Sequence, residues 1–454
     1  MEIAEDTGSA SVALEIPAPR MGGLRKSLSW LFGAQLARLA LGFIVGTLLA
    51  RTLGVAEYGR LSTALGITTL AAFFAELGLR QVIVKEMAQH PRIAGPLMGT
   101  GFRLLCALGI VALLVSAGVV VGMQRADLVP ATLVLSTVFL FNGHVAIYSR
   151  WDARGEAWRA PRFAMIASLA SNAAKVICII AGLGMVAICG AIVLECFVAA
   201  GLVMIYALRS GWLGDLRSWH PLAAKALLAR AFPHFLAQGG TLLLLRLDQV
   251  MLNAISGNEE AGIYGAATRL SELIFLVIPV MVASYLPRLA AIERTNPAAF
   301  RRTAEALLKV VSVMGIAAPV LWWLFGNHIV RLIYGREFAA CGPVLFIHCL
   351  SSLAYLHGQV RSIVLITTGR AYLGAYAAYA GMAINVVLNL WWIPQHGAQG
   401  AAWATAVAYY VVWFAGTFAM PNLRWLAMAQ VRALAAPLMV PMRWREVASA
   451  LRAV

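Results

Sequence analysis

Long apolar runs alternate with short polar segments along most of the chain. Each of twelve such runs approaches or exceeds the roughly 20 residues with which a helix crosses ~30 Å of hydrocarbon. Because lipid offers no hydrogen-bond partner to an open strand edge, every run predicts a helix. The twelve expected spans are 28–50, 61–80, 96–122, 128–149, 163–182, 185–208, 232–255, 262–286, 307–330, 342–366, 371–393 and 397–420. The pattern therefore predicts an all-α, multi-pass membrane protein.

The polar segments between these spans alternate in charge. Most of the 36 Lys and Arg residues lie in residues 1–27, in every second loop and in the segment after the last span. The intervening loops hold Arg51, Arg60, Arg125, Arg331 and Arg336. Since cytoplasmic loops carry the excess of basic residues, we expect both termini in the cytoplasm. The expected location is the inner (plasma) membrane of the cell.

The composition leads to the same class of protein. Hydrophobic residues make up 61% of the chain, charged residues 12%, and the mean hydropathy is +0.79, which leaves too few polar side chains to coat a water-soluble globule. The net charge of +16 raises the question of a nucleic-acid partner. However, the basic residues are scattered through short membrane-flanking loops, so we expect contacts with anionic lipid headgroups and no nucleic acid.

The sequence shows no pattern typical of an enzyme or a metal site. All six cysteines lie inside apolar runs without zinc spacing, and none of the eight histidines stands in a ligand or triad pattern. A Walker lysine loop and a Gly-x-Ser-x-Gly elbow are also absent. We expect no catalytic residues, no cofactor and no metal. Residues 1–27 lack the short apolar core of a cleavable leader, so we interpret them as a cytoplasmic tail.

The chain is expected to consist of two lobes of six spans each. The longest break is the basic segment 211–231, which we interpret as a cytoplasmic linker between an N-lobe, 28–210, and a C-lobe, 232–420. The basic segment 421–454, interrupted by Pro437 and Pro441, predicts an amphipathic tail at the membrane surface.

Internal repetition agrees with this division. Tyr58-Gly59 follows the first span and Tyr264-Gly265 follows the seventh, 206 positions later. A second repeated pair is Gly190-Ala191 and Gly400-Ala401, each near the start of the last span of its half. Since six is an even number of spans, both halves start on the same side, and the repeat is parallel about an axis along the membrane normal.

Several motifs resemble those of a known family. They are Ala50-Arg51-Thr52-Leu53-Gly54 with Glu57-Tyr58-Gly59, Glu76-Leu77-Gly78-Leu79-Arg80, Leu247-Asp248-Gln249-Val250, the run from Gly262 to Leu270, Tyr334-Gly335-Arg336-Glu337-Phe338, and the run from Pro394 to Ala401. Over about residues 25–420 the chain resembles the polysaccharide flippases of the multidrug, oligosaccharidyl-lipid and polysaccharide exporter superfamily. The resemblance implies a multidrug-exporter-like fold and transport of a lipid-linked oligosaccharide repeat unit. Twelve spans favour this branch over the peptidoglycan-precursor flippases, which typically have fourteen.

Cations near the middle of a span are costly unless they face water or a partner. Arg38 and Lys175 have no acidic residue within one helical turn. Together with Arg246, they are our candidate ligands for a diphosphate, because a guanidinium can donate two hydrogen bonds to phosphate oxygens. The alternative is that these side chains reach the membrane surface or pair with acids on other helices.

A second group of charges lies around the seventh and eighth spans. Asp248, Arg269 and Glu272 are expected at similar depth, with Asp248 and Arg269 as partners across the hairpin. This group is interpreted either as a buried ion pair or as a protonatable gate coupled to transport. Glu76 is a further gating or coupling candidate, with a salt bridge to Arg80 as the alternative. For Glu195 the sequence suggests no partner.

The function that these features favour is alternating-access flipping of a polyprenyl-diphosphate-linked oligosaccharide for polysaccharide biosynthesis, such as lipopolysaccharide or exopolysaccharide. Polysaccharide polymerase and chain-length machinery are candidate partners. A small-molecule or multidrug antiporter of the same fold is the alternative, although cationic drugs would favour an acidic cavity. A glycan polymerase or ligase would be expected to have a large outer loop, and all outer loops here are short. A scaffold without transport activity is a further alternative.

Overall fold

The computed structural model describes residues 21–438 and 441–452, and these residues form helices and turns without strands. The helices of the first half are α1 (Met21–Glu76), α2 (Leu79–Gln89), α3 (Ala94–Gly122), α4 (Val129–Ser136), α5 (His144–Ala153), α6 (Arg159–Ile180), α7 (Met185–Arg209) and α8 (Leu213–Leu216). The second half contains α9 (Pro221–Ser271), α10 (Val277–Ile292), α11 (Pro297–Tyr334), α12 (Cys341–Thr367), α13 (Ala371–Tyr409), α14 (Gly416–Phe418), α15 (Arg424–Ala433) and α16 (Pro441–Arg452). The expected all-α class is confirmed.

Eight helices of the described chain are long and apolar enough to cross a membrane, or nine when the bent pair around α4 and α5 is included. Three of these segments are too long for one crossing: Ala37–Gln89, Pro221–Ile292 and Ala371–Phe418 have 53, 72 and 48 residues. Each contains a glycine with non-helical backbone angles inside a continuous helix, at Gly54 in α1, Gly257 in α9 and Gly397 in α13. Divided at these glycines, the helices are consistent with the twelve expected crossings. The chain is thus a multi-pass membrane protein.

Two of these breaks share one backbone conformation. Gly54 has φ 74° and ψ 175°, and Gly257 has φ 86° and ψ −170°. This region of the backbone map is accessible essentially only to glycine. A single residue can therefore join two spans, where the sequence pattern predicts loops of several residues.

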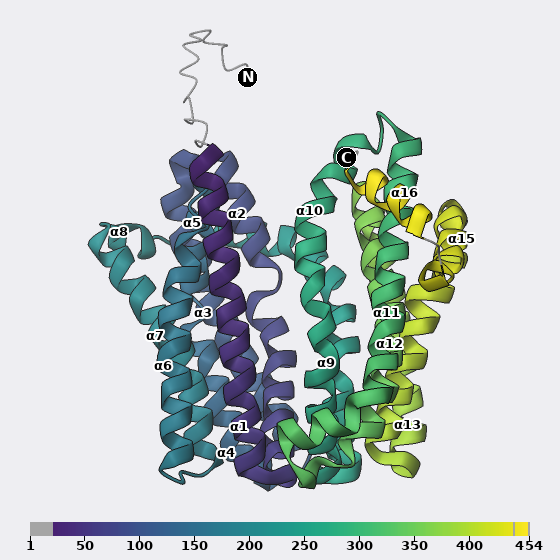
Figure 1. Cartoon of the computed structure of the whole chain (residues 1–454). Helices are drawn as coiled ribbons and strands as arrows, with labels where there is room; N and C mark the ends of the chain where they lie inside the picture. Colours follow the sequence, from purple (N-terminus) through teal and green to yellow (C-terminus); the bar gives the residue numbers. More distant parts are fainter. Residues whose placement is uncertain (1–20, 439–440, 453–454) are drawn as a thin grey trace.

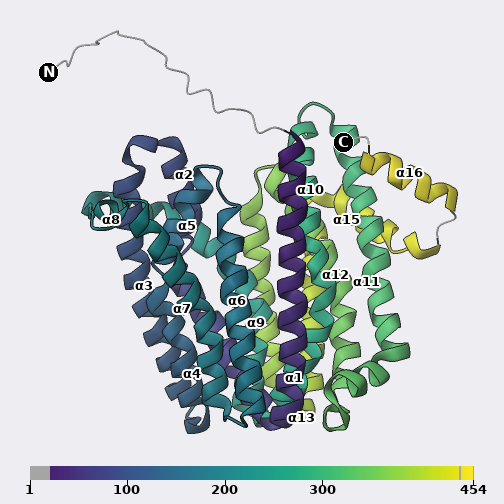
Figure 2. The same cartoon turned by 60° about the vertical axis from the view of Figure 1, so that its left-hand side comes forward.

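The helices form two lobes, α1–α8 and α9–α16 (Figures 1 and 2). The ribbons of the two lobes lie together at the end near the labels α4 and α13, and they diverge toward the end that carries α16 and the start of α1 (Figure 1). We call the latter the termini end and the former the opposite end. At the termini end each lobe has its own apolar core, one around Leu105 and Trp151 and the other around Leu308 and Leu356.

The segment expected to be a linker, 211–231, is largely folded onto the N-lobe. Trp212 and Leu216 belong to the N-lobe core, and the Asp215 carboxylate accepts a hydrogen bond of 2.6 Å from Arg150. Helix α9 begins within this segment, at Pro221. Its first turns also pack in the N-lobe core, through Ala224, Leu227 and Ala231. Pro233 follows inside the same helix, so the chain passes from one lobe to the other within α9.

The basic tail forms α15 and α16, whose 10 and 12 residues are too short for a further crossing. Helix α15 is anchored in the C-lobe, where Leu426 and Gln430 are fully buried. The side-chain amide of Gln430 donates 3.2 Å to the Trp413 carbonyl, which lies in the π-helical segment Tyr410–Ala415. This part of the tail is thus integrated into the lobe rather than resting only on the membrane surface.

Candidate functional site

Two large cavities are lined by residues of both lobes. The first has a volume of about 690 Å³ and lies among α1, α6, α7, the end of α9 and the short 3₁₀ segment Glu272–Leu276. Its charged side chains are Arg38, Lys175, Glu195 and Arg269. We call it the cationic cavity, because three basic groups face one carboxylate.

Arg38 and Lys175 were expected in a common site, and the structure brings them together at the wall of this cavity. Within residues 21–438 and 441–452, no carboxylate forms an ion pair with either side chain. Both cations are half-buried and lie beside space that can hold water or a ligand. An uncompensated charge at this depth is tolerated only beside such space.

Arg269 is the third cation, and it was expected as a partner of Asp248. Its guanidinium instead crosses to the N-lobe and donates a hydrogen bond of 2.7 Å to the Gly42 carbonyl. A Cβ atom on Gly46 would overlap this guanidinium. The Gly42 and Gly46 stripe on α1 therefore leaves room for an arginine side chain of the other lobe.

Glu195 on α7 is the carboxylate of this cavity, opposite Lys175. The sequence suggested no partner for Glu195, because Lys175 lies on a different helix, α6, 20 positions earlier in the chain. Ser168 and Asn172 of α6 also line the cavity, but their side chains are bonded to each other and to the helix backbone. An uncharged pair of this kind gives no signal in a hydropathy pattern.

Arg246 does not join the cationic cavity. Its guanidinium makes two hydrogen bonds to the Glu272 carboxylate, at 3.1 and 3.2 Å. The charge of Arg246 is thus matched by a bidentate partner outside the cationic cavity, and its assignment as a diphosphate ligand stays a prediction. The ion pair across this hairpin joins Arg246 and Glu272 rather than Asp248 and Arg269.

Asp248 lies in a different, closed environment, where its side chain is 3% exposed. It accepts hydrogen bonds from the Tyr264 hydroxyl and, at 3.0 Å, from the Thr405 hydroxyl. Its second oxygen accepts from the backbone N–H of Gln249 at 2.7 Å. The carboxylate thus joins the two halves of α9 to α13, and it does not contact Arg269.

Glu76 does not form the salt bridge to Arg80 that was its alternative interpretation. Arg80 instead pairs with Asp152 at 3.1 Å. In the described chain Glu76 has no ion-pair partner within 4 Å, and its side chain lines the second cavity. It therefore remains a candidate for gating or coupling, without a contact that assigns the role.

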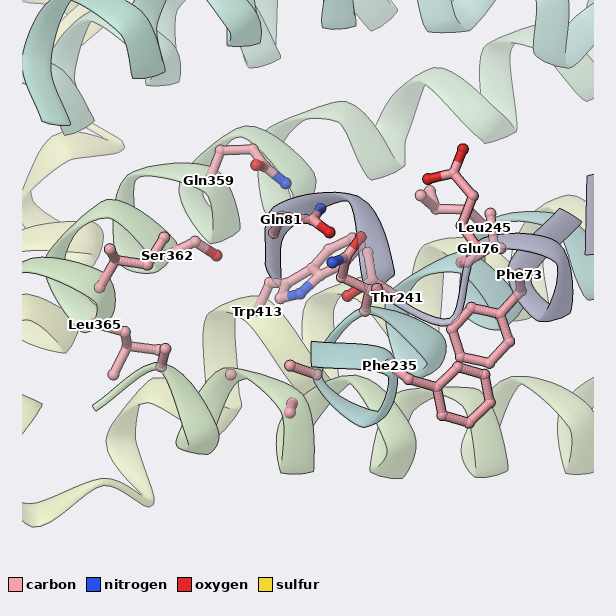
Figure 3. A pocket seen from close by; sticks show the side chains of 18 of the residues that line it. Phe73, Glu76, Gln81, Phe235, Thr241, Leu245, Gln359, Ser362, Leu365 and Trp413 are labelled. Carbon is pink, nitrogen blue, oxygen red and sulfur yellow. The ribbon is translucent and has the colours of Figure 1, made fainter. Parts of the chain in front are cut away.

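The second cavity has a volume of about 730 Å³ and lies between the end of the second span and the C-lobe helices α9, α12 and α13 (Figure 3). Its wall includes residues near the termini end, such as Gly78, Gln81 and Ala371. Three glutamines and several hydroxyl groups supply most of its polar side chains, which are Gln81, Gln238, Gln359, Thr69, Thr241 and Ser362. We call it the amide cavity.

At the opposite end the two lobes are in direct contact. Gly59 of α1 and Gly262 of α9 face one another so closely that a Cβ on Gly59 would overlap the Asn258 carbonyl and one on Gly262 would overlap the Val55 carbonyl. These residues belong to the repeated Tyr-Gly runs of the two halves, which thus cross each other in space. The repeat marks the place where the lobes meet.

A polar network extends this contact. The Arg125 guanidinium donates 3.0 Å to the Asn253 carbonyl and 2.8 Å to the Asn258 side chain. Asp127 accepts from Arg125 and Asn258 and pairs with Arg60 at 3.2 Å. Hydrogen bonds with Arg125 hold the pKa of Asp127 down at about 2. The opposite end is therefore closed by groups from both lobes.

The chain is similar in sequence to two flippases and in fold to a solved structure. The chain is 23% identical over 396 residues to the probable flippase AglR of Haloferax volcanii, which covers 86% of this chain and 81% of that one. It is 24% identical over 414 residues to the lipid III flippase of Escherichia coli, covering 86% and 96%. The structure of the lipid II flippase MurJ in an inward closed conformation superposes with a TM-score of 0.69 at 13% identity, covering 93% of this chain and 97% of that one.

The family model described as polysaccharide biosynthesis protein matches residues 24–293, more than half of the chain. This match contains the Tyr-Gly runs of both halves and every charged residue of the cationic cavity. The chain belongs to the polysaccharide biosynthesis protein family, as its sequence motifs predicted.

Proposed function

We propose that the protein carries a polyprenyl-diphosphate-linked oligosaccharide from the cytoplasmic to the outer leaflet, for polysaccharide biosynthesis. The observation that carries this proposal is the cationic cavity, where Arg38, Lys175 and Arg269 face the single carboxylate of Glu195. The diphosphate is the anionic part of such a lipid. Charge-assisted hydrogen bonds from these side chains would replace the water that the diphosphate loses. The flippase relatives support the same substrate class.

The termini end is placed in the cytoplasm, in keeping with the basic loops that lie there. The molecule is then closed at its outer end, and the amide cavity lies on the cytoplasmic side. Transport requires the outer contacts to part and the lobes to close at the termini end. With an inside-negative potential, outward movement of a negative headgroup is favourable by about 2.3 kcal/mol per charge per 100 mV, so a coupling ion is not needed.

A multidrug antiporter of the same fold is the competing function. Glu195 is the one group of the cationic cavity that would favour a cationic drug, and three basic side chains oppose it. Like charges within a low-dielectric site raise the free energy of binding. The cavity therefore favours an anionic substrate.

The test is a flipping assay in proteoliposomes with a fluorescent polyprenyl diphosphate that carries an oligosaccharide. We expect Arg38→Ala and Lys175→Ala each to lower the initial rate about tenfold or more, since a hydrogen bond to a charged group contributes about 1.5–3 kcal/mol. Arg103→Ala is the matched control, because Arg103 is exposed and donates 2.6 Å to the Arg217 carbonyl, outside both cavities. An unchanged rate in the Arg38→Ala, Lys175→Ala double variant would refute the proposal. Transport of a cationic dye in place of the lipid would favour the antiporter.

A further inference from the structure

The amide cavity differs from the cationic cavity in its chemistry. Its wall combines the side-chain amides of Gln81, Gln238 and Gln359 with the rings of Phe73, Phe235 and Trp413. Figure 3 shows all of these side chains except Gln238 with labels, together with Thr241, Ser362 and Glu76, contributed by both lobes. A site with many neutral donors and acceptors beside aromatic surface suits an uncharged, hydroxyl-rich ligand.

The three amides have no hydrogen-bond partner in the part of the chain that the structure describes. Two other glutamines show the contrast. Gln249 donates to the Ser62 hydroxyl and the Ala261 carbonyl, and Gln430 donates to the Trp413 carbonyl. Amides that hold the fold together are thus bonded to the protein, whereas those of the cavity are free to bond a ligand. Each can donate and accept at once, as a sugar hydroxyl does.

The aromatic rings supply the apolar part of the wall. Phe73 of α1 and Phe235 of α9 are stacked with their centroids 4.0 Å apart, which joins the two lobes at the rim. Trp413 is held edge-on against Tyr355 and is 4% exposed, so it closes the wall behind the rings of Phe73 and Phe235. The C–H faces of a pyranose ring can pack on such surfaces while its hydroxyls reach the amides.

The charges of this cavity do not favour an anion. Its charged lining residues are Glu76 and Arg361, one of each sign. Arg361 is 1% exposed and donates 2.7 Å to the Val412 carbonyl, so that one of its donors is taken up by the protein. A diphosphate therefore has a stronger site in the cationic cavity.

The same helical segments supply residues to both cavities. Arg246 follows Leu245, which lines the amide cavity, and Glu272 precedes Leu273, which lines the cationic cavity. The Arg246–Glu272 pair thus belongs to segments that contribute to both walls. A ligand that occupies both cavities would extend along these segments.

We propose that the amide cavity is the binding site for the uncharged sugars of the glycan, while the cationic cavity holds the diphosphate. This proposal rests on the proposed function, because it assigns the second half of the same substrate. It makes Gln81, Gln238 and Gln359 the specificity-determining residues. The rings of Phe73 and Phe235 are their apolar counterpart.

The experiment compares two probes on the full-length protein in detergent. One is a polyprenyl diphosphate without sugar, and the other carries a neutral tetrasaccharide of glucose and N-acetylglucosamine. We expect the wild type to bind the glycan-bearing probe at least tenfold more tightly than the bare diphosphate. The Gln81→Leu, Gln238→Leu, Gln359→Leu triple variant should lose this tenfold preference and keep its affinity for the bare diphosphate, because the amides that would bond the sugar hydroxyls are removed.

Two further variants make the outcomes distinct. Gln395→Leu changes an exposed amide near the opposite end and should bind both probes as the wild type does. Gln238→Leu alone should weaken the preference severalfold. Because Gln238 is exposed, this single variant is expected to fold, and it tests the site even if the triple variant misfolds. A preference that survives the triple substitution, or a wild type without any preference, would overturn the glycan site. If the wild type instead fails to bind the bare diphosphate, the cationic cavity is not a diphosphate site and the proposed function is refuted. The glycan site is then tested separately, by comparing the affinity of the glycan-bearing probe for the wild type and for the triple variant.

Discussion

The two ends of the interface between the lobes are built from different groups. At the opposite end backbone meets backbone, where Gly59 and Gly262 leave no room for a Cβ atom. Toward the termini end the lobes meet largely through side chains, such as the stacked Phe73 and Phe235, around a cavity of about 730 Å³. A backbone contact fits only one arrangement of two helices, whereas side chains can move among rotamers. The closed end is therefore specific, and the hollow end is adaptable.

The largest effect on this comparison is expected from Gly59→Ala. The new methyl group would overlap the Asn258 carbonyl, and a backbone carbonyl cannot move aside as a side chain can. The closed arrangement should therefore be destabilised by about 1–3 kcal/mol. Spin labels at Ile180 and Trp391, both exposed near the opposite end, should report a longer inter-lobe distance. Gly118→Ala is the control, since no atom lies within 4 Å of its added Cβ. An unchanged distance distribution would show that this crossing does not hold the end closed.

A smaller effect is expected from Gly46→Ala, because here the overlapping group is the end of a flexible side chain. The new methyl group would displace the Arg269 guanidinium and with it the hydrogen bond to the Gly42 carbonyl. We expect binding of bare polyprenyl diphosphate to weaken severalfold, about 1 kcal/mol, while the inter-lobe distance stays the same. Gly33→Ala, on the same helix, adds a Cβ with no atom within 4 Å and outside both cavities, and it serves as the control. Equal affinity in the two variants would argue against a role of Arg269 in binding.

The smallest effect is expected from the polar network beside the glycine crossing. The pKa of Asp127 is lowered to about 2 by hydrogen bonds with Arg125, below its value of about 4 in an unfolded chain. Its contribution to closure is therefore fully present above about pH 4 and is lost as the pH falls through about 2. Between pH 5 and 8 the inter-lobe distance should not change in the wild type. Asp127→Asn should lengthen it slightly at every pH in this range, and a pH-dependent distance in the wild type would contradict the assignment.

The sequence was a good guide to the fold because hydrophobic length and loop charge both arise from the membrane. The expected spans correspond to helices or to parts of them, and the single-residue breaks at Gly54 and Gly257 could be seen only in the structure. Such a break depends on backbone angles, for which a glycine in an apolar run is no sufficient signal.

The candidate site was predicted in part. Arg38 and Lys175 were recognisable because a charge in an apolar run is conspicuous, and the structure places them in one cavity. The partner of Arg246 was missed, because equal depth in the membrane does not fix the direction in which a side chain points around its helix. Asp248 faces Tyr264 and Thr405, so Arg246 pairs with Glu272. The glutamines of the amide cavity gave no signal at all, since they lie on three different helices and a single neutral amide in a helix carries no charge to mark it.

The way in which the chain passes from one lobe to the other sets the scale of the motion. The first turns of α9 are fixed to the N-lobe, where the backbone N–H of His220 also bonds the Thr100 hydroxyl at 3.3 Å. Pro233 removes a helical hydrogen bond just beyond this anchor, which makes it a natural pivot. From there to Gly257 the helix is a lever roughly 36 Å long, at about 1.5 Å per residue. A tilt of about 15° at its base would carry Gly257 by roughly 9 Å, enough to separate the glycine crossing completely while the anchored turns stay in place.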